Sequence, residues 1–250
     1  MRWVRVRYDN RNYGGHWIDD HIVTENGPVL KCEEVTWLAP VQPSKIVGLA
    51  LNYRDHAAEL GLAEPEEPVL FFKPPSALTG HLNPIYYPQG STHCHYETEL
   101  AVVIGRRCRG VSAERALDYV RGYTIANDFT CRDYITNMFR PPVRAKGFDT
   151  FCPLGPALYP ADEVADPGRL QIVTRVNGEI RQSGNTRHLA HGIPDIIAYL
   201  SSFMTLEAED VILSGTPRGI SPVYPGDRIM CEIEGLGELV NTVESDSFSG

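Results

Sequence analysis

The stretch HYETELAVVIG, residues 95–105, restricts the fold of this chain more than any other. Its five consecutive apolar residues before Gly105 are typical of a strand that is buried on both faces. Glu97 and Glu99 stand at the start of this run, and the two-residue period of a strand puts both carboxylates on one face. Two like charges at that spacing repel each other, so their burial raises a pKa or requires a cation between them.

The rest of the 250-residue chain is rich in strand-like runs and has few helical ones. Asn177-Gly178, between two β-rich runs, is a strong hairpin signal. Helical spacing of apolar residues predicts helices over residues 52–62, over residues 112–123 with Ser112 as the cap, and in the segment that begins at Ile193. Because these helices do not alternate regularly with strands, the pattern predicts an α+β fold that is mainly β.

A linker divides the chain near residue 40. The residues before it read as short strands and turns, with a Glu-Asn-Gly turn at residues 25–27. Pro40 and Pro43 are typical of a linker into the main body. We therefore expect a small N-terminal β segment and linker over residues 1–44 and a catalytic domain with one core over residues 45–250.

Composition excludes several classes of partner and enzyme. The formal net charge of −9 argues against a nucleic-acid or anionic-membrane surface, but it is compatible with a small anionic substrate. No apolar run is long enough to span a bilayer and the N-terminus lacks an apolar signal-peptide core, so we expect a cytoplasmic protein. The six cysteines form no C-x-x-C pair and are expected to be reduced. The motifs of serine hydrolases, NTPases and dinucleotide enzymes are absent from the sequence.

A third carboxylate, Asp128, ends the predicted strand TIAND, residues 124–128. Three carboxylates at two strand ends indicate a site for a hard divalent cation such as Mg²⁺, with Mn²⁺ or Ca²⁺ as alternatives. A solvated strand face is the competing interpretation of the E-x-E pair. A second rival is a cupin-type transition-metal site, because His93 and His95 precede Glu99 in an H-x-H-x₃-E arrangement. That option is weaker, since no second motif with a late histidine ligand follows.

His56 and Glu59 lie three residues apart on a predicted helix and therefore share one of its faces. An imidazole and a carboxylate in that arrangement could act together in proton transfer, although an exposed polar helix face is equally open. Basic and hydroxyl side chains elsewhere are candidates for binding the carboxylates of a substrate: Lys73, Arg54, Arg132, Lys146 and Thr216. Lys146 is also a candidate for a catalytic role. Each of these five could instead be an ordinary surface or turn residue.

Seven ordered motifs resemble the fumarylacetoacetate hydrolase family: GLALNYRDHAAEL, LFFKPPSALTG, HYETELAVVIG, DYVRGYTIANDFTCRDY, RAKGFDTFCPLGP, VNGEIRQSGNT and VILSGTPRGISPVYPGD. The match runs from about Lys45 almost to the end of the chain. The resemblance implies a mixed β-roll fold, usually dimeric, with a divalent cation held by Glu97, Glu99 and Asp128. It also implies that His56 and Glu59 form the acid/base pair, and that the substrate site includes Arg132, Lys146 and Thr216.

Within the family, strings such as NYRDHAAELG and YLSSFMTLEAED are most similar to the carboxy-terminal half of bifunctional isomerase/decarboxylases of 4-hydroxyphenylacetate degradation. That resemblance implies decarboxylation of 5-carboxymethyl-2-oxo-hex-3-ene-1,7-dioate and isomerisation of 2-hydroxyhepta-2,4-diene-1,7-dioate, by a homodimer or with a paralogous subunit. One departure is Ile135, because hydrolases that act on fumarylacetoacetate carry Gln at this position. An acylpyruvate hydrolase, an oxaloacetate decarboxylase and a non-catalytic Ca²⁺-binding module remain alternatives.

Overall fold

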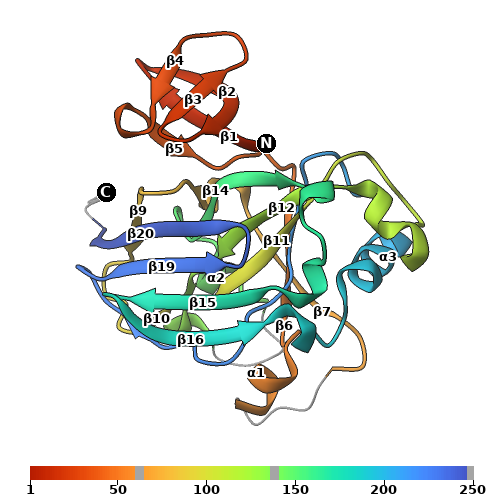
Figure 1. Cartoon of the computed structure of the whole chain (residues 1–250). Helices are drawn as coiled ribbons and strands as arrows, with labels where there is room; N and C mark the ends of the chain where they lie inside the picture. The colour runs from red at the N-terminus through yellow and green to blue at the C-terminus, as the bar shows by residue number, and fades with distance from the viewer. Residues whose placement is uncertain (60–64, 136–140, 247–250) are drawn as a thin grey trace.

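The computed structural model describes residues 1–59, 65–135 and 141–246, without the side chains of residues 56–58. The chain is mainly β, as predicted (Figure 1). Its largest sheet has twelve strands. Ten of them form a path in the order β4 (Val29–Lys31), β3 (His21–Thr24), β2 (Arg11–Ile18), β1 (Arg2–Tyr8), β14 (Cys152–Pro160), β12 (Val120–Asn127), β11 (Thr98–Ile104), β17 (Val211–Leu213), β6 (Ile46–Ala50) and β7 (Val69–Lys73). The other two are β5 (Thr36–Leu38), which pairs with β1, and β8 (Leu78–Thr79), which pairs with β14.

Two smaller sheets and a few helices complete the fold. A five-stranded sheet has the order β16 (Glu179–Asn185), β15 (Gln171–Val176), β19 (Arg228–Ile233), β20 (Gly237–Ser245) and β9 (Pro84–Tyr87). A three-stranded sheet has the order β13 (Thr130–Cys131), β10 (Cys94–His95) and β18 (Pro222–Val223). The α-helices described are α1 (Arg54–Glu59), α2 (Val143–Lys146) and α3 (Ile193–Phe203). The 3₁₀ turns are η1 (Cys32–Glu34), η2 (Pro75–Ala77), η3 (Ala113–Tyr119), η4 (Arg132–Tyr134), η5 (Ala161–Glu163), η6 (Pro167–Arg169) and η7 (Thr186–His188).

Strand β11 lies at the centre of the molecule and is buried at every position. Leu100 and Val102 point into the main core, which also holds residues of the five-stranded sheet and of α3. Ala101 and Val103 point the other way, into a second apolar cluster. Burial on both faces is what the continuous apolar run predicted, because each face of the strand is covered by a separate layer.

The predicted Asn177-Gly178 hairpin is confirmed, and the helix predicted over residues 112–123 is wrong. Asn177 and Gly178, with φ angles of 52° and 87°, turn the chain between β15 and β16. In place of the helix, the 3₁₀ turn η3 ends at Tyr119, and Ser112 makes no capping hydrogen bond. The residues that follow form β12, which pairs with both β11 and β14. The backbone hydrogen bonds that this strand makes on two sides outweigh the local helical spacing.

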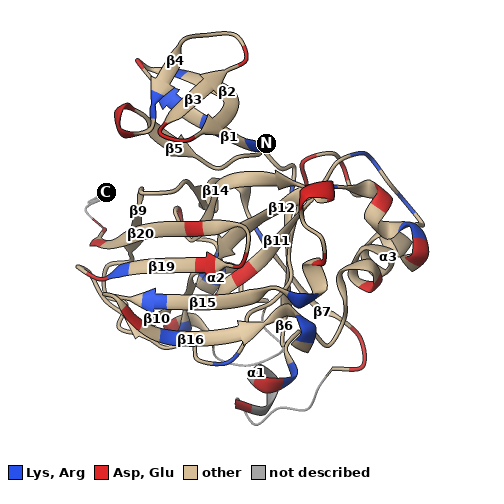
Figure 2. Ribbon diagram, in the orientation of Figure 1, with Lys and Arg blue, Asp and Glu red and all other residues tan. Residues whose placement is uncertain are grey.

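The charged side chains and the cysteines are distributed as in an ordinary globular protein. Lys and Arg are spread over separate elements with Asp and Glu between them (Figure 2). All six cysteines are free, and five of them are buried. No helix within the described part of the chain is long and apolar enough to cross a membrane.

The N-terminal strands β1–β5 pack at one end of the molecule around a small apolar core that also includes Ala157 of β14 (Figure 1). The segment around Gly80 and His81 connects them to the five-stranded sheet. The ring of His81 packs edge-on against Trp37, at 5.4 Å between centroids, and its Nδ1 accepts a hydrogen bond from the backbone N–H of Val240 at 3.1 Å. Gly80 is required here because a Cβ would lie 2.1 Å from the backbone oxygen of Trp37.

His81 makes stability depend on pH. Burial, and after it the charge of Arg228, lowers the pKa of His81 to about 4. Between pH 6.5 and 4 the unfolded chain therefore binds a proton that the folded chain does not, so stability falls as the pH falls through this window. In His81→Asn the amide oxygen can still accept from Val240 but does not titrate. We expect urea midpoints measured from about pH 7 to about pH 4 to fall less steeply for this variant, whereas parallel curves would contradict the assignment.

Candidate functional site

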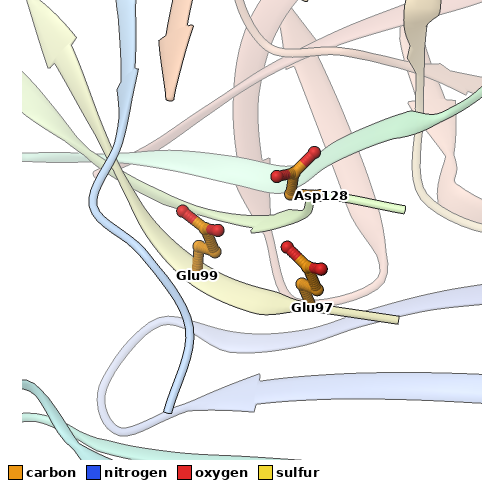
Figure 3. Close-up of side chains that lie close together, drawn as sticks. All are labelled: Glu97, Glu99 and Asp128. Atoms are coloured by element: carbon orange, nitrogen blue, oxygen red, sulfur yellow. The ribbon is translucent and has the colours of Figure 1, made fainter. Parts of the chain in front are cut away.

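Three carboxylates meet where β11 begins and β12 ends. The antiparallel pairing of Thr98 with Asn127 brings Glu97, just before β11, next to Asp128, just after β12. The backbone N–H of Asp128 donates to the carbonyl of Glu97 at 2.8 Å, and Asn127 Oδ1 accepts from the N–H of Glu97 at 2.9 Å. Carboxylate oxygens of Glu97, Glu99 and Asp128 lie within 4.8 Å of one another, and all three residues are buried (Figure 3). The predicted third ligand is thus beside the E-x-E pair.

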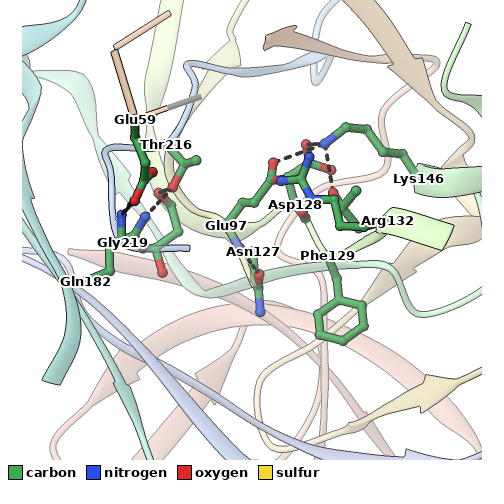
Figure 4. Close-up of polar contacts among 12 residues, drawn as sticks. Glu59, Glu97, Asn127, Asp128, Phe129, Arg132, Lys146, Gln182, Thr216 and Gly219 are labelled. Atoms are coloured by element: carbon green, nitrogen blue, oxygen red, sulfur yellow. Dashed lines mark hydrogen bonds and ion pairs between the residues drawn. The ribbon is translucent and has the colours of Figure 1, made fainter. Parts of the chain in front are cut away.

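Lys146, the last residue of α2, binds two of the three carboxylates. Its Nζ donates to Glu97 Oε2 at 3.0 Å, to Thr130 Oγ1 at 2.8 Å and to Asp128 Oδ2 (Figure 4). The three hydrogen bonds use all three protons of the ammonium group. Burial alone would lower the pKa of Lys146, but the carboxylates of Asp128 and Glu97 raise it overall.

Two further cations satisfy the remaining oxygens of Glu97 and Asp128. Lys73, at the end of β7, is fully buried and donates to Asp128 Oδ1 at 2.6 Å and to the carbonyl of Phe129 at 3.2 Å. Arg132, at the start of η4, donates from Nη2 to Glu97 Oε1. Both residues were predicted from the sequence as substrate-binding residues, and the structure brings both to the cluster.

Glu99 is the carboxylate of the cluster that pairs with no cation in the described part of the chain. Its Oε2 accepts the N–H of Gly215 at 2.6 Å, and it has no salt-bridge partner among the residues described. Burial, and then the charges of Asp128 and Glu97, raises the pKa of Glu99 well above its ordinary value. Gly215 has a φ of 98°, and its missing side chain leaves room for Asn52, whose Cβ would lie 3.0 Å from an added Cβ.

The donor set fits a divalent metal ion. Carboxylate oxygens are the ligands that Mg²⁺ and Mn²⁺ prefer, and these three lie within reach of one another. An added cation would also supply the positive counter-charge that Glu99 lacks. The hydroxyls of Tyr53 and Ser214 are buried without a hydrogen-bond partner in the described chain. Burial, followed by the charge of Glu99, raises the pKa of Tyr53. The Tyr53 hydroxyl therefore stays protonated beside the charge of Glu99.

The predicted acid/base segment begins directly after β6. Asn52 fixes its start, donating to the carbonyl of Ser214 at 2.8 Å and accepting from the N–H of His191 at 2.9 Å. Glu59, at the end of α1, accepts the N–H of Gly219 on both carboxylate oxygens, at 3.1 and 3.3 Å (Figure 4). His56 lies in α1, three residues before Glu59, but its side chain is outside the described residues. Arg54, the first residue of α1, is exposed.

His93 and His95 lie near the cluster but do not belong to it. Their ring centroids are 4.7 Å apart. Burial, and after it the charges of Arg132 and His93, lowers the pKa of His95 to about 4, so the imidazole is neutral at pH 7. Among the described residues the group that could hold a metal consists of three carboxylates alone, so the cupin-type arrangement is not the one that forms.

The sequence indicated only one of the residues whose contacts hold the loop 214–219 in place. Thr216, which it did predict, donates from Oγ1 to the carbonyl of Thr98 at 2.9 Å and accepts from Gln182 Nε2 at 2.8 Å. Gln182 gave no signal, because it lies on a hairpin strand whose neighbouring residues are mostly exposed. The contacts of Gly215 and Gly219 gave none either, because they use backbone N–H groups, which every residue except proline has.

Known proteins resemble this chain over most of its length. The family model described as "Fumarylacetoacetate (FAA) hydrolase C-terminal" matches residues 45–244. A 4-hydroxyphenylacetate degradation bifunctional isomerase/decarboxylase of Escherichia coli is 45% identical over 88% of this chain and 52% of its own length. A mitochondrial oxaloacetate tautomerase of Homo sapiens is 44% identical over 86% of this chain and 72% of its own. The chain thus spans about half the length of the bifunctional relative.

Solved structures share the fold over the whole chain. A 5-carboxymethyl-2-hydroxymuconate delta-isomerase from Mycobacterium smegmatis has a TM-score of 0.89 at 38% identity, covering 99% of this chain and all of that one. A maleylpyruvate hydrolase from Sphingobium, solved with manganese(II) and pyruvate, has a TM-score of 0.84 at 31% identity, with the same coverage. The site lies inside the region that the family model matches. This chain belongs to the fumarylacetoacetate hydrolase family.

Proposed function

We propose that this chain is a divalent-metal-dependent enzyme of aromatic catabolism that decarboxylates and isomerises an unsaturated 2-oxo di- or tricarboxylate. The observation that carries the proposal is the buried cluster of Glu97, Glu99 and Asp128, surrounded by Lys146, Lys73 and Arg132. The similarity to an isomerase/decarboxylase and to a delta-isomerase supports this substrate class. The cytoplasm is the proposed location.

The proposed metal ligands are Glu97, Glu99 and Asp128, and Mg²⁺ is the proposed ion, with Mn²⁺ or Ca²⁺ as alternatives. When bound, the ion supplies a Lewis acid for the 2-oxo group and its neighbouring carboxylate. The maleylpyruvate hydrolase from Sphingobium, whose structure contains manganese(II) and pyruvate together, supports both the class of ion and the 2-oxo acid.

The residues of the chain would bind the anionic parts of the substrate. Arg132, whose side chain is 24% exposed, would bind a distal carboxylate with the planar guanidinium geometry that suits bidentate contacts. Lys146 holds Glu97 and Asp128 in place and keeps a positive charge beside the reacting carbon chain. Arg54 is proposed to contact the substrate as well, and Thr216 to line the site without donating to the substrate, because its hydroxyl proton goes to the carbonyl of Thr98.

The proton-transfer step is assigned to α1. Loss of CO₂ from a carbon conjugated to the 2-oxo group leaves its electron pair in a dienolate, and a proton must return to carbon. We assign delivery of that proton to His56, oriented by Glu59, whose carboxylate the N–H of Gly219 holds. Isomerisation of the 2-hydroxydiene needs no loss of CO₂: the enol hydroxyl loses its proton to give the same kind of dienolate, and a proton adds to carbon to give the 2-oxo-ene isomer. One site would therefore serve both reactions.

A second candidate is turnover of oxaloacetate, which the similarity to a mitochondrial oxaloacetate tautomerase favours. Cleavage of fumarylacetoacetate itself is disfavoured by Ile135, which is 42% exposed and follows Arg132 by three residues. Because the bifunctional relative is about twice as long as this chain, we propose that a second copy or a paralogous subunit completes the functional unit.

The substrate is tested with metal-stripped protein and the tricarboxylate 2-oxo-ene acid. We expect CO₂ release only after Mg²⁺ is added, and its loss when the ion is chelated, because the carboxylate cluster needs the cation to hold the 2-oxo group. Release of CO₂ and the diene absorbance are measured together. Cleavage of acylpyruvates, or turnover of oxaloacetate alone, would replace the proposed reaction, and tight Ca²⁺ retention without turnover of any 2-oxo acid would indicate a binding module.

Glu99→Gln separates metal binding from stability. The amide oxygen can keep the hydrogen bond from Gly215, while the change removes a buried carboxylate that has no salt-bridge partner among the described residues. We expect the metal-free variant to melt at the wild-type temperature or above it, but to lose at least about 100-fold in Mn²⁺ affinity and in turnover. Glu238→Gln, an exposed change on β20, is the control. Wild-type Mn²⁺ affinity in Glu99→Gln, measured by calorimetry, would refute the ligand assignment.

Glu59→Gln tests the acid/base pair. The amide cannot hold an imidazolium as a carboxylate does, so we expect exchange of the substrate's carbon-bound protons with D₂O to slow by about 100-fold, the lower end of general acid–base effects. The Mn²⁺ dissociation constant should change by less than about twofold, because Glu59 is not among the three clustered carboxylates. Exchange is followed by proton NMR, with the exposed change Glu66→Gln as the control. Wild-type exchange in Glu59→Gln would exclude this residue from proton transfer.

A further inference from the structure

A closed ring of hydrogen bonds lies next to the carboxylate cluster and includes Thr98, the residue between Glu97 and Glu99. Gln182 Nε2 donates to Thr216 Oγ1 at 2.8 Å, and Gln182 Oε1 accepts from Thr174 Oγ1 at 2.7 Å. The hydroxyls of Thr174 and Thr98 are 2.6 Å apart, and Thr216 Oγ1 donates to the carbonyl of Thr98 at 2.9 Å. All four residues are buried, and they come from β11, β15, β16 and the loop 214–219.

The partners assign every proton in this ring. The second N–H of Gln182 donates to the carbonyl of Pro217 at 2.7 Å, and since a carbonyl only accepts, the amide cannot be flipped. Thr174 then gives its proton to Gln182 and must accept from Thr98. Thr216 gives its only hydroxyl proton to the carbonyl of Thr98, so it cannot also donate to a substrate carboxylate while the ring is closed.

Gln182 is thereby attached to the loop that contacts both parts of the site. Its two N–H groups hold Thr216 and Pro217, between Gly215, which donates to Glu99, and Gly219, which donates to Glu59 (Figure 4). Close packing leaves the loop little room to shift against β16. A Cβ on Gly184 would lie 2.4 Å from Pro217 Cβ, and one on Gly219 would lie 2.7 Å from the carbonyl oxygen of Arg181.

We propose that Gln182 is a positioning residue of the metal site, which fixes the loop 214–219 so that Gly215 holds Glu99 and Gly219 holds Glu59. It acts through these two backbone N–H groups and touches neither carboxylate itself. The proposal rests on the proposed function insofar as Glu99 is a metal ligand. It adds a requirement that the three carboxylates alone do not impose, namely an intact amide on the β15–β16 hairpin.

The test uses Gln182→Met and Gln182→Glu with metal-free full-length protein. Glu keeps the shape of Gln and the bond from Thr174 but loses both donors, so the two variants separate hydrogen bonding from packing. In both we expect the Mn²⁺ dissociation constant, measured by calorimetry, to rise about tenfold, the equivalent of one lost hydrogen bond. The kcat for substrate proton exchange should fall further than KM changes, because Glu59 is displaced together with Glu99.

Gln171→Met is the matched control, because it removes an exposed glutamine from the same hairpin. The side-chain amide of Gln171 donates to Ser183 Oγ at 3.0 Å. This variant should match the wild type in Mn²⁺ affinity. A lower melting temperature with unchanged Mn²⁺ affinity in the Gln182 variants would overturn the proposal and make Gln182 a purely structural residue. A wild type without Mn²⁺ affinity would overturn it together with the metal assignment.

Two further outcomes keep the two proposals apart. If the wild type binds Mn²⁺ but turns over no 2-oxo acid, the proposed function fails, and the dissociation constants alone still decide the role of Gln182. If neither Gln182 variant folds, Thr174→Val replaces them, since it removes one hydroxyl from the ring and keeps the side-chain shape. We expect it to raise the Mn²⁺ dissociation constant at least about threefold, and an unchanged value would overturn the proposal.

Discussion

The burial of three carboxylates side by side is the constraint on which the rest of the structure depends. Removing a carboxylate from water costs several kcal/mol unless cations and hydrogen bonds replace the solvent. Lys146, Lys73 and Arg132 provide that replacement for Glu97 and Asp128, and they come from three separate elements, α2, β7 and η4. Ordering these elements around the start of β11 is therefore a condition for keeping Glu97 and Asp128 ionised. Glu99 is the exception, and it is the position where an added cation gains most.

The loop 214–219 connects the two chemical functions of the site. Its N–H groups reach Glu99 at one end and Glu59 at the other, so the carboxylate cluster and α1 share one support. Neither contact depends on a side chain of the loop. The loop itself must therefore be held by its surroundings, and the hydrogen-bond ring and the close packing against β16 do this. A rigid loop fixes the positions of two carboxylates at once, those of Glu99 and Glu59.

The sequence predicted the parts of the site whose chemistry lies at the ends of recognisable strands. Glu97 and Glu99 start an apolar strand and Asp128 ends another, and antiparallel pairing of the two strands is enough to bring the three together. The helix expected at residues 112–123 was wrong because sheet pairing on both sides of β12 is a long-range effect that local spacing cannot reveal. The sequence did not indicate Gln182 for a related reason, since its hydrogen-bond partner Thr216 is 34 residues away along the chain.

The arrangement also explains how one family can include isomerases, decarboxylases and hydrolases. Under the proposed function each reaction on a 2-oxo acid passes through an enol or enolate, and a cation held by the carboxylate cluster would stabilise that charge whichever bond breaks. The cluster therefore does not choose the reaction. Selection has to come from groups outside it that bind the rest of the substrate or admit water, such as the partly exposed Arg132 and Ile135. An apolar side chain at residue 135 cannot orient a water molecule by hydrogen bonding, which favours reactions that need none.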